Sequence, residues 1–188
     1  MSLKEITKEK HAAAESTLFM KAVFKKSLPQ ELWIDWTKQK SYFYNKIEYY
    51  SGQLGLLDDI SNIRRSYFLL QDYTIMNNSS GLIHNLRKPV LAYGDYIDVI
   101  GTDADKILAH LYTWHMGDMF GGQMIKKVVP GSHLALEFEN VPALMQALRS
   151  KLHDGLGPEA NTAFDWAINM MKDYDGDLEQ NRIACQTF

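Results

Sequence analysis

Residues 114–123, WHMGDMFGGQ, lie inside a stretch whose apolar spacing otherwise predicts one long helix over residues 103–128. A glycine within a helix costs roughly 1 kcal/mol relative to alanine, and this segment contains Gly117, Gly121 and Gly122. Gly117 and Gly121 are four residues apart, so they share one face of the helix, and that face has no side chains. Such a face is typical of close helix–helix packing, and it also suits a flat ligand that lies against the backbone.

Asp118 favours the second of these interpretations. A carboxylate beside a bare helix face is unfavourable in a helix–helix contact unless water or a hydrogen-bond donor reaches it. In a ligand site the same carboxylate can hold an ordered water molecule. The segment therefore predicts a binding site in which Gly117 and Gly121 form a wall and Asp118 supplies a polar group.

The rest of the chain is also dominated by helix signals. Ser2 and Glu5 form a capping-box pattern, and Pro29 suits the first turn of a helix that Gly52 ends. The sequence predicts an all-α single domain over residues 1–188, a compact bundle of seven or eight helices. The expected helices cover about residues 2–15, 20–27, 29–52, 59–76, 89–100, 103–128, 141–153 and 158–184, and residues 133–138 alternate as in a short extended segment.

Composition and charge limit the classes of function. The chain has 188 residues, of which 46% are hydrophobic and 23% charged, as in an ordinary folded domain. Its net charge of −3 and the lack of a basic-aromatic stripe argue against a nucleic-acid partner. Cys185 is the only cysteine, so a reducing compartment is expected. With neither a leader nor an apolar run near 18 residues in the sequence, we expect a cytoplasmic protein that does not enter a membrane.

A second candidate site lies in the first predicted helix. Lys4, Lys8, His11 and Glu15 are spaced so that they share one helical stripe. This stripe is typical of an ordinary solvated face, and it also suits the edge of a ligand site. A neutral imidazole is a good axial ligand for haem iron, the lysines could meet an anionic periphery, and Glu15 could orient the imidazole.

Other catalytic patterns do not occur in the sequence. No histidine follows a glutamate at the three-residue spacing of di-iron bundles, and neither a Gly-x-Ser-x-Gly elbow nor a phosphate loop is present. We expect the other histidines singled out to be structural or exposed; these are His84, His110, His115 and His153.

Two segments of the sequence resemble the haem oxygenase family, and they occur in the same order as in that family. Residues 8–16, KEKHAAAES, with Lys4 before them, are similar to the family's proximal helix. Residues 109–113, AHLYT, followed by Gly117-Asp118 and by 121–123, GGQ, are similar to its distal helix. Pieces around Arg149 and residues 162–164, TAF, extend the resemblance over nearly the whole chain.

The resemblance implies a role for each matching residue. His11 becomes the iron ligand, supported by Glu15, and Asp118 becomes the aspartate of a distal water network with Tyr112 as a partner. The glycines become backbone over the haem, and Phe164 becomes a haem-binding residue. Lys4, Lys8 and Arg149 become partners of the haem propionates.

The chain also departs from the family pattern. The family usually has Arg and Tyr where Trp114 and His115 stand, Ser where Phe120 stands, and a cation where Met145 stands. These departures concern the shape of the distal pocket and the seating of the haem.

The activity implied is oxidative cleavage of haem b, at once cofactor and substrate, to biliverdin, CO and ferrous iron. It uses O2, is expected at the α meso carbon, and takes electrons from ferredoxin or a similar reductant, as in members from photosynthetic lineages, bacteria and their viruses. Two alternatives remain at this point: a bundle of the same architecture with other chemistry, such as a thiaminase-like enzyme, and a non-catalytic haem carrier or sensor.

Overall fold

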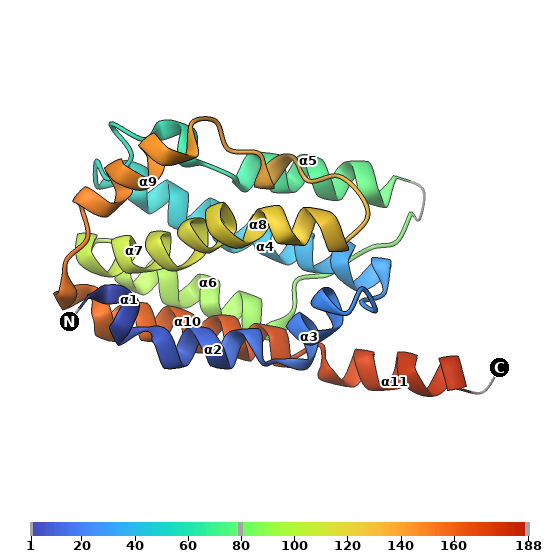
Figure 1. The fold of residues 1–188 in the computed structure, drawn as a ribbon. Coiled ribbons are helices and arrows are strands. Elements are labelled where there is room, and N and C mark those ends of the chain that lie inside the picture. Colours follow the sequence, from blue (N-terminus) through green and yellow to red (C-terminus); the bar gives the residue numbers. More distant parts are fainter. Residues whose placement is uncertain (1, 79–80, 187–188) are drawn as a thin grey trace.

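The computed structural model describes residues 2–78 and 81–186, with side chains up to residue 180, and within them every regular element is helical. The prediction of an all-α bundle is confirmed (Figure 1). Cys185 lies outside the residues whose side chains are described. The α-helices are α1 (Leu3–Ile6), α2 (Lys8–Glu15), α3 (Leu18–Phe24), α4 (Gln30–Gln53), α5 (Ser66–Asn77), α6 (Lys88–Ile100), α7 (Ala104–Leu111), α8 (Gly117–Val128), α9 (Val141–Ser150), α10 (Gly157–Lys172) and α11 (Asp175–Gln186).

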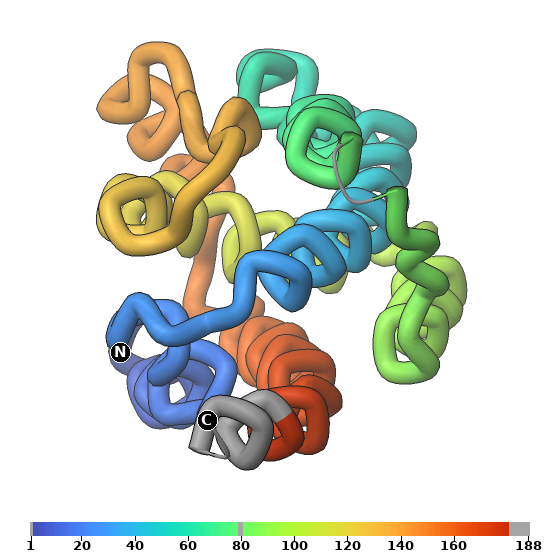
Figure 2. The backbone as a smooth tube through the Cα atoms, turned by 90° about the vertical axis from the view of Figure 1, so that its right-hand side faces the viewer, coloured from blue at the N-terminus to red at the C-terminus, as the bar shows by residue number. Residues whose placement is uncertain are grey.

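Helix α4 forms the centre of the bundle. It packs against α5, α6 and α7. Figure 2 shows α4 running between other helices, several of which are seen nearly end-on. Helix α10 packs against α2, α3 and α7 on the side of the bundle away from α5, and α11 extends beyond the bundle next to α3 (Figure 1). The surrounding helices bury α4 along most of its length, so the polar residues on its buried faces need partners inside the protein.

Aromatic side chains fill the space between α4 and its neighbours. Trp36 and Phe43 of α4 are buried, as their apolar spacing predicts, and the rings of Phe43 and Trp114 lie 4.6 Å apart. Tyr93 of α6 completes this cluster with its ring 5.3 Å from Phe43. The cluster ties α4 to the segment that carries residues 114–123.

Three helices predicted as continuous are divided in the structure. The capping box of Ser2 and Glu5 is confirmed, but the first helix breaks at Thr7, whose hydroxyl donates to the Leu3 carbonyl. The C-terminal helix is divided around residues 173–174. The long helix is interrupted by η2 (Tyr112–Met116), a π-helical segment directly before Gly117. Segments of this kind often occur at functional sites.

Two local predictions are wrong, and buried carboxylates explain both. The helix expected from residue 59 is a 3-10 turn, η1 (Ser61–Ile63), followed by α5, because Glu48 accepts hydrogen bonds from the first amides of α5. The segment expected to be extended over 133–138 contains the 3-10 turn η3 (Leu134–Leu136). There the Asp72 carboxylate accepts hydrogen bonds from the backbone amides of Leu134 and Ala135, and these bonds favour a turn over an extended segment. A last 3-10 turn, η4 (Asp154–Leu156), precedes α10.

Among the described residues, no helix combines the length and the apolar character that crossing a bilayer requires.

Candidate functional site

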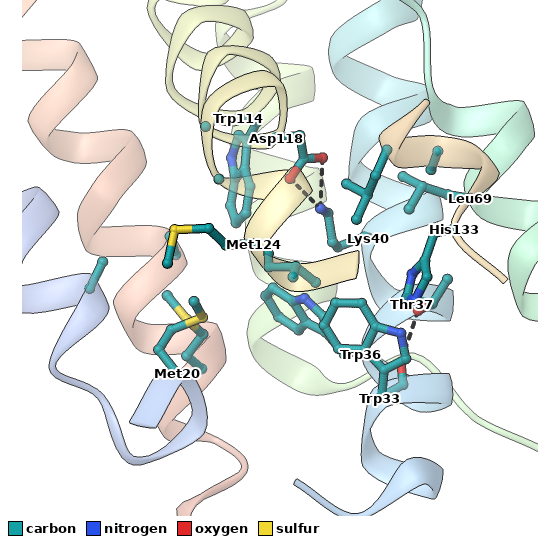
Figure 3. Close-up of a pocket in the computed structure, with 18 of the residues that line it drawn as sticks. Met20, Trp33, Trp36, Thr37, Lys40, Leu69, Trp114, Asp118, Met124 and His133 are labelled. Atoms are coloured by element: carbon teal, nitrogen blue, oxygen red, sulfur yellow. Dashed lines mark hydrogen bonds and ion pairs between the residues drawn. The ribbon is translucent and has the colours of Figure 1, made fainter. Parts of the chain in front are cut away.

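A pocket lies between α2 and α10 on one side and α4, η2 and α8 on the other. Most of its surface is apolar, with Trp33 and Trp36 from α4 and methionines from α3, α8 and α10 (Figure 3). The structure brings residues from both predicted site blocks to this one pocket. The predicted site residues among them are His11, Glu15, Gly117, Asp118 and Gly121, and Phe164 of the 162–164 piece joins them.

The glycines of α8 have two different functions. A methyl group added at Gly117 or Gly121 would meet no atom within 4 Å, so both positions face open space. A methyl group at Gly122 would lie 3.1 Å from a side-chain carbon of Leu136, so this glycine permits close packing of η3. Both interpretations of the glycine segment therefore apply, each to different residues, and Gly122 does not line the pocket.

Asp118 projects from α8 into a buried group of polar side chains. Its carboxylate accepts hydrogen bonds from the ammonium of Lys40, at 2.9 and 2.8 Å, and from the Tyr44 hydroxyl, at 2.6 Å. Burial, and after it the negative charge of Asp118, raises the pKa of Tyr44 well above its usual range, which keeps the hydroxyl a donor. The carboxylate is thus held from two points on α4.

Sequence reasoning did not find Lys40 and Tyr44. They lie four residues apart on α4, and Glu48 follows at the same spacing, so the three share one face. This spacing of polar residues between apolar ones is the only feature of the sequence that points to Lys40 and Tyr44. A solvated stripe on a helix has the same pattern.

The π-helical segment places a second buried pair behind Asp118. His115 Nε2 lies 2.9 Å from Glu48, which also accepts the Ser66 amide. Burial alone would raise the pKa of Glu48, but the hydrogen bond and charge of His115, with the Arg65 amide, lower it below its usual value. His115 is therefore buried and paired with Glu48 inside the protein.

His110 belongs to a further buried network. The Trp114 indole donates to the Tyr93 hydroxyl at 2.8 Å, Tyr93 lies 2.7 Å from His110 Nδ1, and His110 Nε2 lies 2.9 Å from Glu159. Burial lowers the pKa of His110, although Glu159 opposes that shift. A neutral imidazole therefore accepts from Tyr93 and donates to Glu159, and the network fixes the Trp114 ring at the pocket. Of the two alternatives predicted for His110, structural or exposed, the structure shows it buried within a hydrogen-bond network.

His11 lies on the opposite wall and is held by few contacts. Its side chain is 56% exposed, its Nδ1 lies 3.8 Å from Glu15, and its ring meets the edge of Phe164 at 5.7 Å. Glu15 lies on the Nδ1 side of the ring, beyond hydrogen-bond distance.

Several predicted site residues are not among those that line the pocket. Lys4 is on α1 and Lys8 on α2, so the break at Thr7 divides their stripe, and both are exposed. Arg149 of α9 lies with its guanidinium 5.6 Å from the ring centre of Phe120. Met145 packs against the core at the position where a cation was expected.

Tyr112 is likewise not a pocket-lining residue. It lies half-buried at the start of η2, where it packs against the core. The tyrosine that contacts Asp118 is Tyr44, from a different helix.

Both blocks lie within a region of the chain that matches a known family. The family model described as "Heme oxygenase" matches residues 1–151. The chain belongs to the haem oxygenase family.

Relatives of this haem oxygenase family member occur in mammals and bacteria. "Heme oxygenase 2" of Macaca fascicularis is 28% identical over 92% of this chain and 64% of its own length, so the chain spans less than two thirds of the length of this mammalian relative. "Heme oxygenase 1" of Synechocystis is 25% identical over 94% of this chain and 84% of its own length.

Solved structures show the same fold. The structure of haem oxygenase-1 from Synechocystis in complex with haem has a TM-score of 0.85 at 22% identity, covering 99% of this chain and 96% of that one. The haem oxygenase of Leptospira interrogans has a TM-score of 0.79 at 22% identity, covering 92% of this chain and all of the other.

Proposed function

We propose that the chain binds haem b in this pocket and cleaves it oxidatively with O2. One observation carries the proposal. The imidazole of His11 on one wall lies across the pocket from bare backbone at Gly117 and Gly121, with the Asp118 carboxylate beside these glycines. A flat macrocycle with apolar faces fits this arrangement, because open space lies over both glycines and the surrounding side chains are mainly apolar.

His11 is the proposed ligand of the haem iron. A neutral imidazole is a suitable ligand, and Glu15 near Nδ1 favours the tautomer that leaves Nε2 free. Phe164 limits rotation of the ring by its edge contact. The His11 side chain is more than half exposed, so it is free to adjust to the haem plane when the ligand enters.

The opposite wall has the proposed catalytic function. Gly117 and Gly121 present backbone to the haem face, while Asp118 holds an ordered water that can pass a proton into the pocket. When bound, haem supplies the iron centre at which O2 is activated. The protein's part is to hold the water, exclude bulk solvent with apolar side chains, and leave one meso edge accessible.

The proposed products are biliverdin, CO and ferrous iron, with cleavage mainly at the α meso carbon. Ferredoxin or a similar reductant is the proposed electron donor. Lys4, Lys8 and Arg149 are long, exposed cations proposed as propionate partners at the rim. Each exposed ion pair contributes at most about 1 kcal/mol, so the pocket shape must supply the rest of the orientation.

A reconstitution experiment tests this function. Haem is titrated into the protein and followed by its Soret band, then reductant and air are added and the bilins are separated by chromatography. We expect stoichiometric haem binding and a biliverdin product, and loss of product in His11→Ala that added imidazole restores. His153→Ala is the matched control, because His153 is exposed and distant from the pocket lining.

The alternatives give different results in the same experiment. A bundle enzyme of other chemistry would bind no haem, and a carrier would bind haem without converting it. A His11→Ala variant that keeps full activity without imidazole would contradict the ligand assignment.

Removing Lys8 and Arg149 together should spread the product over more meso isomers, and a single unchanged isomer would mean that shape alone orients the haem.

A further inference from the structure

Lys40 is the only lysine or arginine among the described residues that line the pocket. Its side chain is 8% exposed, and that of Asp118 is 9% exposed. Figure 3 shows it reaching from α4 toward Asp118, with both dashed contacts on its nitrogen. The remaining N–H of the ammonium is free of the carboxylate, and the Tyr44 ring lies 5.0 Å from the nitrogen.

Stability alone is a poor explanation for this buried pair. Removing two charges from water is costly, and apolar residues of similar volume often replace such pairs without loss of stability. Methionine would fill the space of the Lys40 stem, which is surrounded by α4, α8 and apolar pocket residues. The chain instead places a cation beside the one carboxylate of the glycine wall.

We propose that Lys40 is a positioning residue that balances the charge of Asp118 and orients its carboxylate at the pocket. The inference rests on the proposed function, in which haem lies between His11 and this wall. Lys40 reaches both carboxylate oxygens and Tyr44 one of them, so the carboxylate plane is defined from α4. The wall that faces the ligand then carries a cation and an anion whose electrostatic effects largely cancel at a distance.

The charge balance predicts opposite effects of removing each partner. A water bound to ferric haem loses its proton at a pH that is visible in the absorbance spectrum. A nearby cation favours the resulting hydroxide, and a nearby carboxylate disfavours it. Lys40→Met leaves the carboxylate alone and should raise the midpoint pH by about one unit, on the order of the effect of one neighbouring unpaired charge. Asp118→Asn leaves the ammonium alone and should lower the midpoint.

Two further variants and a control complete the experiment. The double variant Lys40→Met/Asp118→Asn should return close to the wild-type midpoint, and Lys40→Arg should keep it. Lys46→Met is the matched control, since Lys46 lies on the same helix but pairs with Asp98 away from this pocket. In the haem-free protein, each single charge removal should lower the denaturation midpoint more than the double variant does.

The outcomes separate this inference from the proposed function. Wild-type protein that binds no haem overturns both. Haem binding with the same spectroscopic midpoint in Lys40→Met and wild type overturns the role of Lys40 alone. A Lys40→Met variant that changes only the denaturation midpoint would make Lys40 a structural brace between α4 and α8, and the proposal would be wrong.

Discussion

The two walls of the pocket are built in different ways. On the α2 wall, His11 and Glu15 are more than half exposed and 3.8 Å apart. On the α4–α8 wall, Lys40, Tyr44 and Asp118 are buried and joined by hydrogen bonds of 2.6 to 2.9 Å. The difference shows that one wall is fixed before a ligand arrives, whereas the other can adjust its position.

The cause of this difference lies in the packing of the helices. Helix α4 is buried along most of its length, so its polar side chains persist only with internal partners. Helix α2 lies at the surface and buries only Ala14. Under the proposed function, Asp118 as a proton-delivering group benefits from a fixed position, and His11 as an iron ligand has room to adjust.

The largest effect should follow from breaking the fixed wall. Asp118→Ala leaves the Lys40 ammonium buried without its partner, and we expect the free energy of unfolding to fall by about 3 kcal/mol. Urea denaturation of the haem-free protein measures it. Asp118→Asn should cost less, because an amide still accepts a hydrogen bond. A loss below about 1 kcal/mol would mean that water reaches Lys40 in the folded protein.

Acidification should weaken the network behind the fixed wall. Burial lowers the pKa of His110 from 6.5, so below that pH the unfolded chain binds a proton that the folded protein excludes. The contribution of His110 to the free energy of unfolding is therefore complete above about pH 6.5. It falls as the pH decreases below that value, by at most about 1.4 kcal/mol per pH unit. Glu48 and Glu159, whose pKa values are also lowered, add losses only below about 4.5.

Denaturation between pH 7 and 5 checks the histidine contribution. His110→Gln should reduce the dependence of stability on pH in this range. An unchanged slope in that variant would contradict the assignment to His110.

Adding one methyl group to the bare face should separate stability from binding. Gly121→Ala should stabilise the haem-free protein by about 0.5–1 kcal/mol, because alanine favours the helix and the added carbon meets nothing within 4 Å. The same methyl group should weaken haem binding in a titration. Gly94→Ala is the matched control, since its methyl would lie 2.6 Å from the Tyr42 ring and should destabilise the protein. Unchanged haem affinity in Gly121→Ala would place the ligand elsewhere.

The smallest effect on stability is expected on the adjustable wall. His11→Ala should change the free energy of unfolding by less than about 0.5 kcal/mol, because an exposed side chain with few contacts contributes little. Thermal or urea denaturation of the haem-free protein tests this. A loss comparable to that of Asp118→Ala would show that the two walls are equally fixed.

Local sequence patterns determined much of this molecule. The spacing of Trp36 and Phe43 and the Ser2–Glu5 box predicted helical elements correctly, because helix periodicity and capping depend on residues within one or two turns. The same local logic identified the open face of Gly117 and Gly121. His11 could be singled out because few residue types suit an iron ligand.

Only the tertiary structure decided what surrounds these residues. Lys40 and Tyr44 are separated from Asp118 by more than 70 positions in the chain, and no local pattern pairs them. The π-helical segment and the packing of Gly122 against Leu136 likewise depend on neighbours from other helices. Periodicity determines which face of a helix is apolar, but the partner of a buried charge is selected by which helices pack together, and that follows from the whole chain.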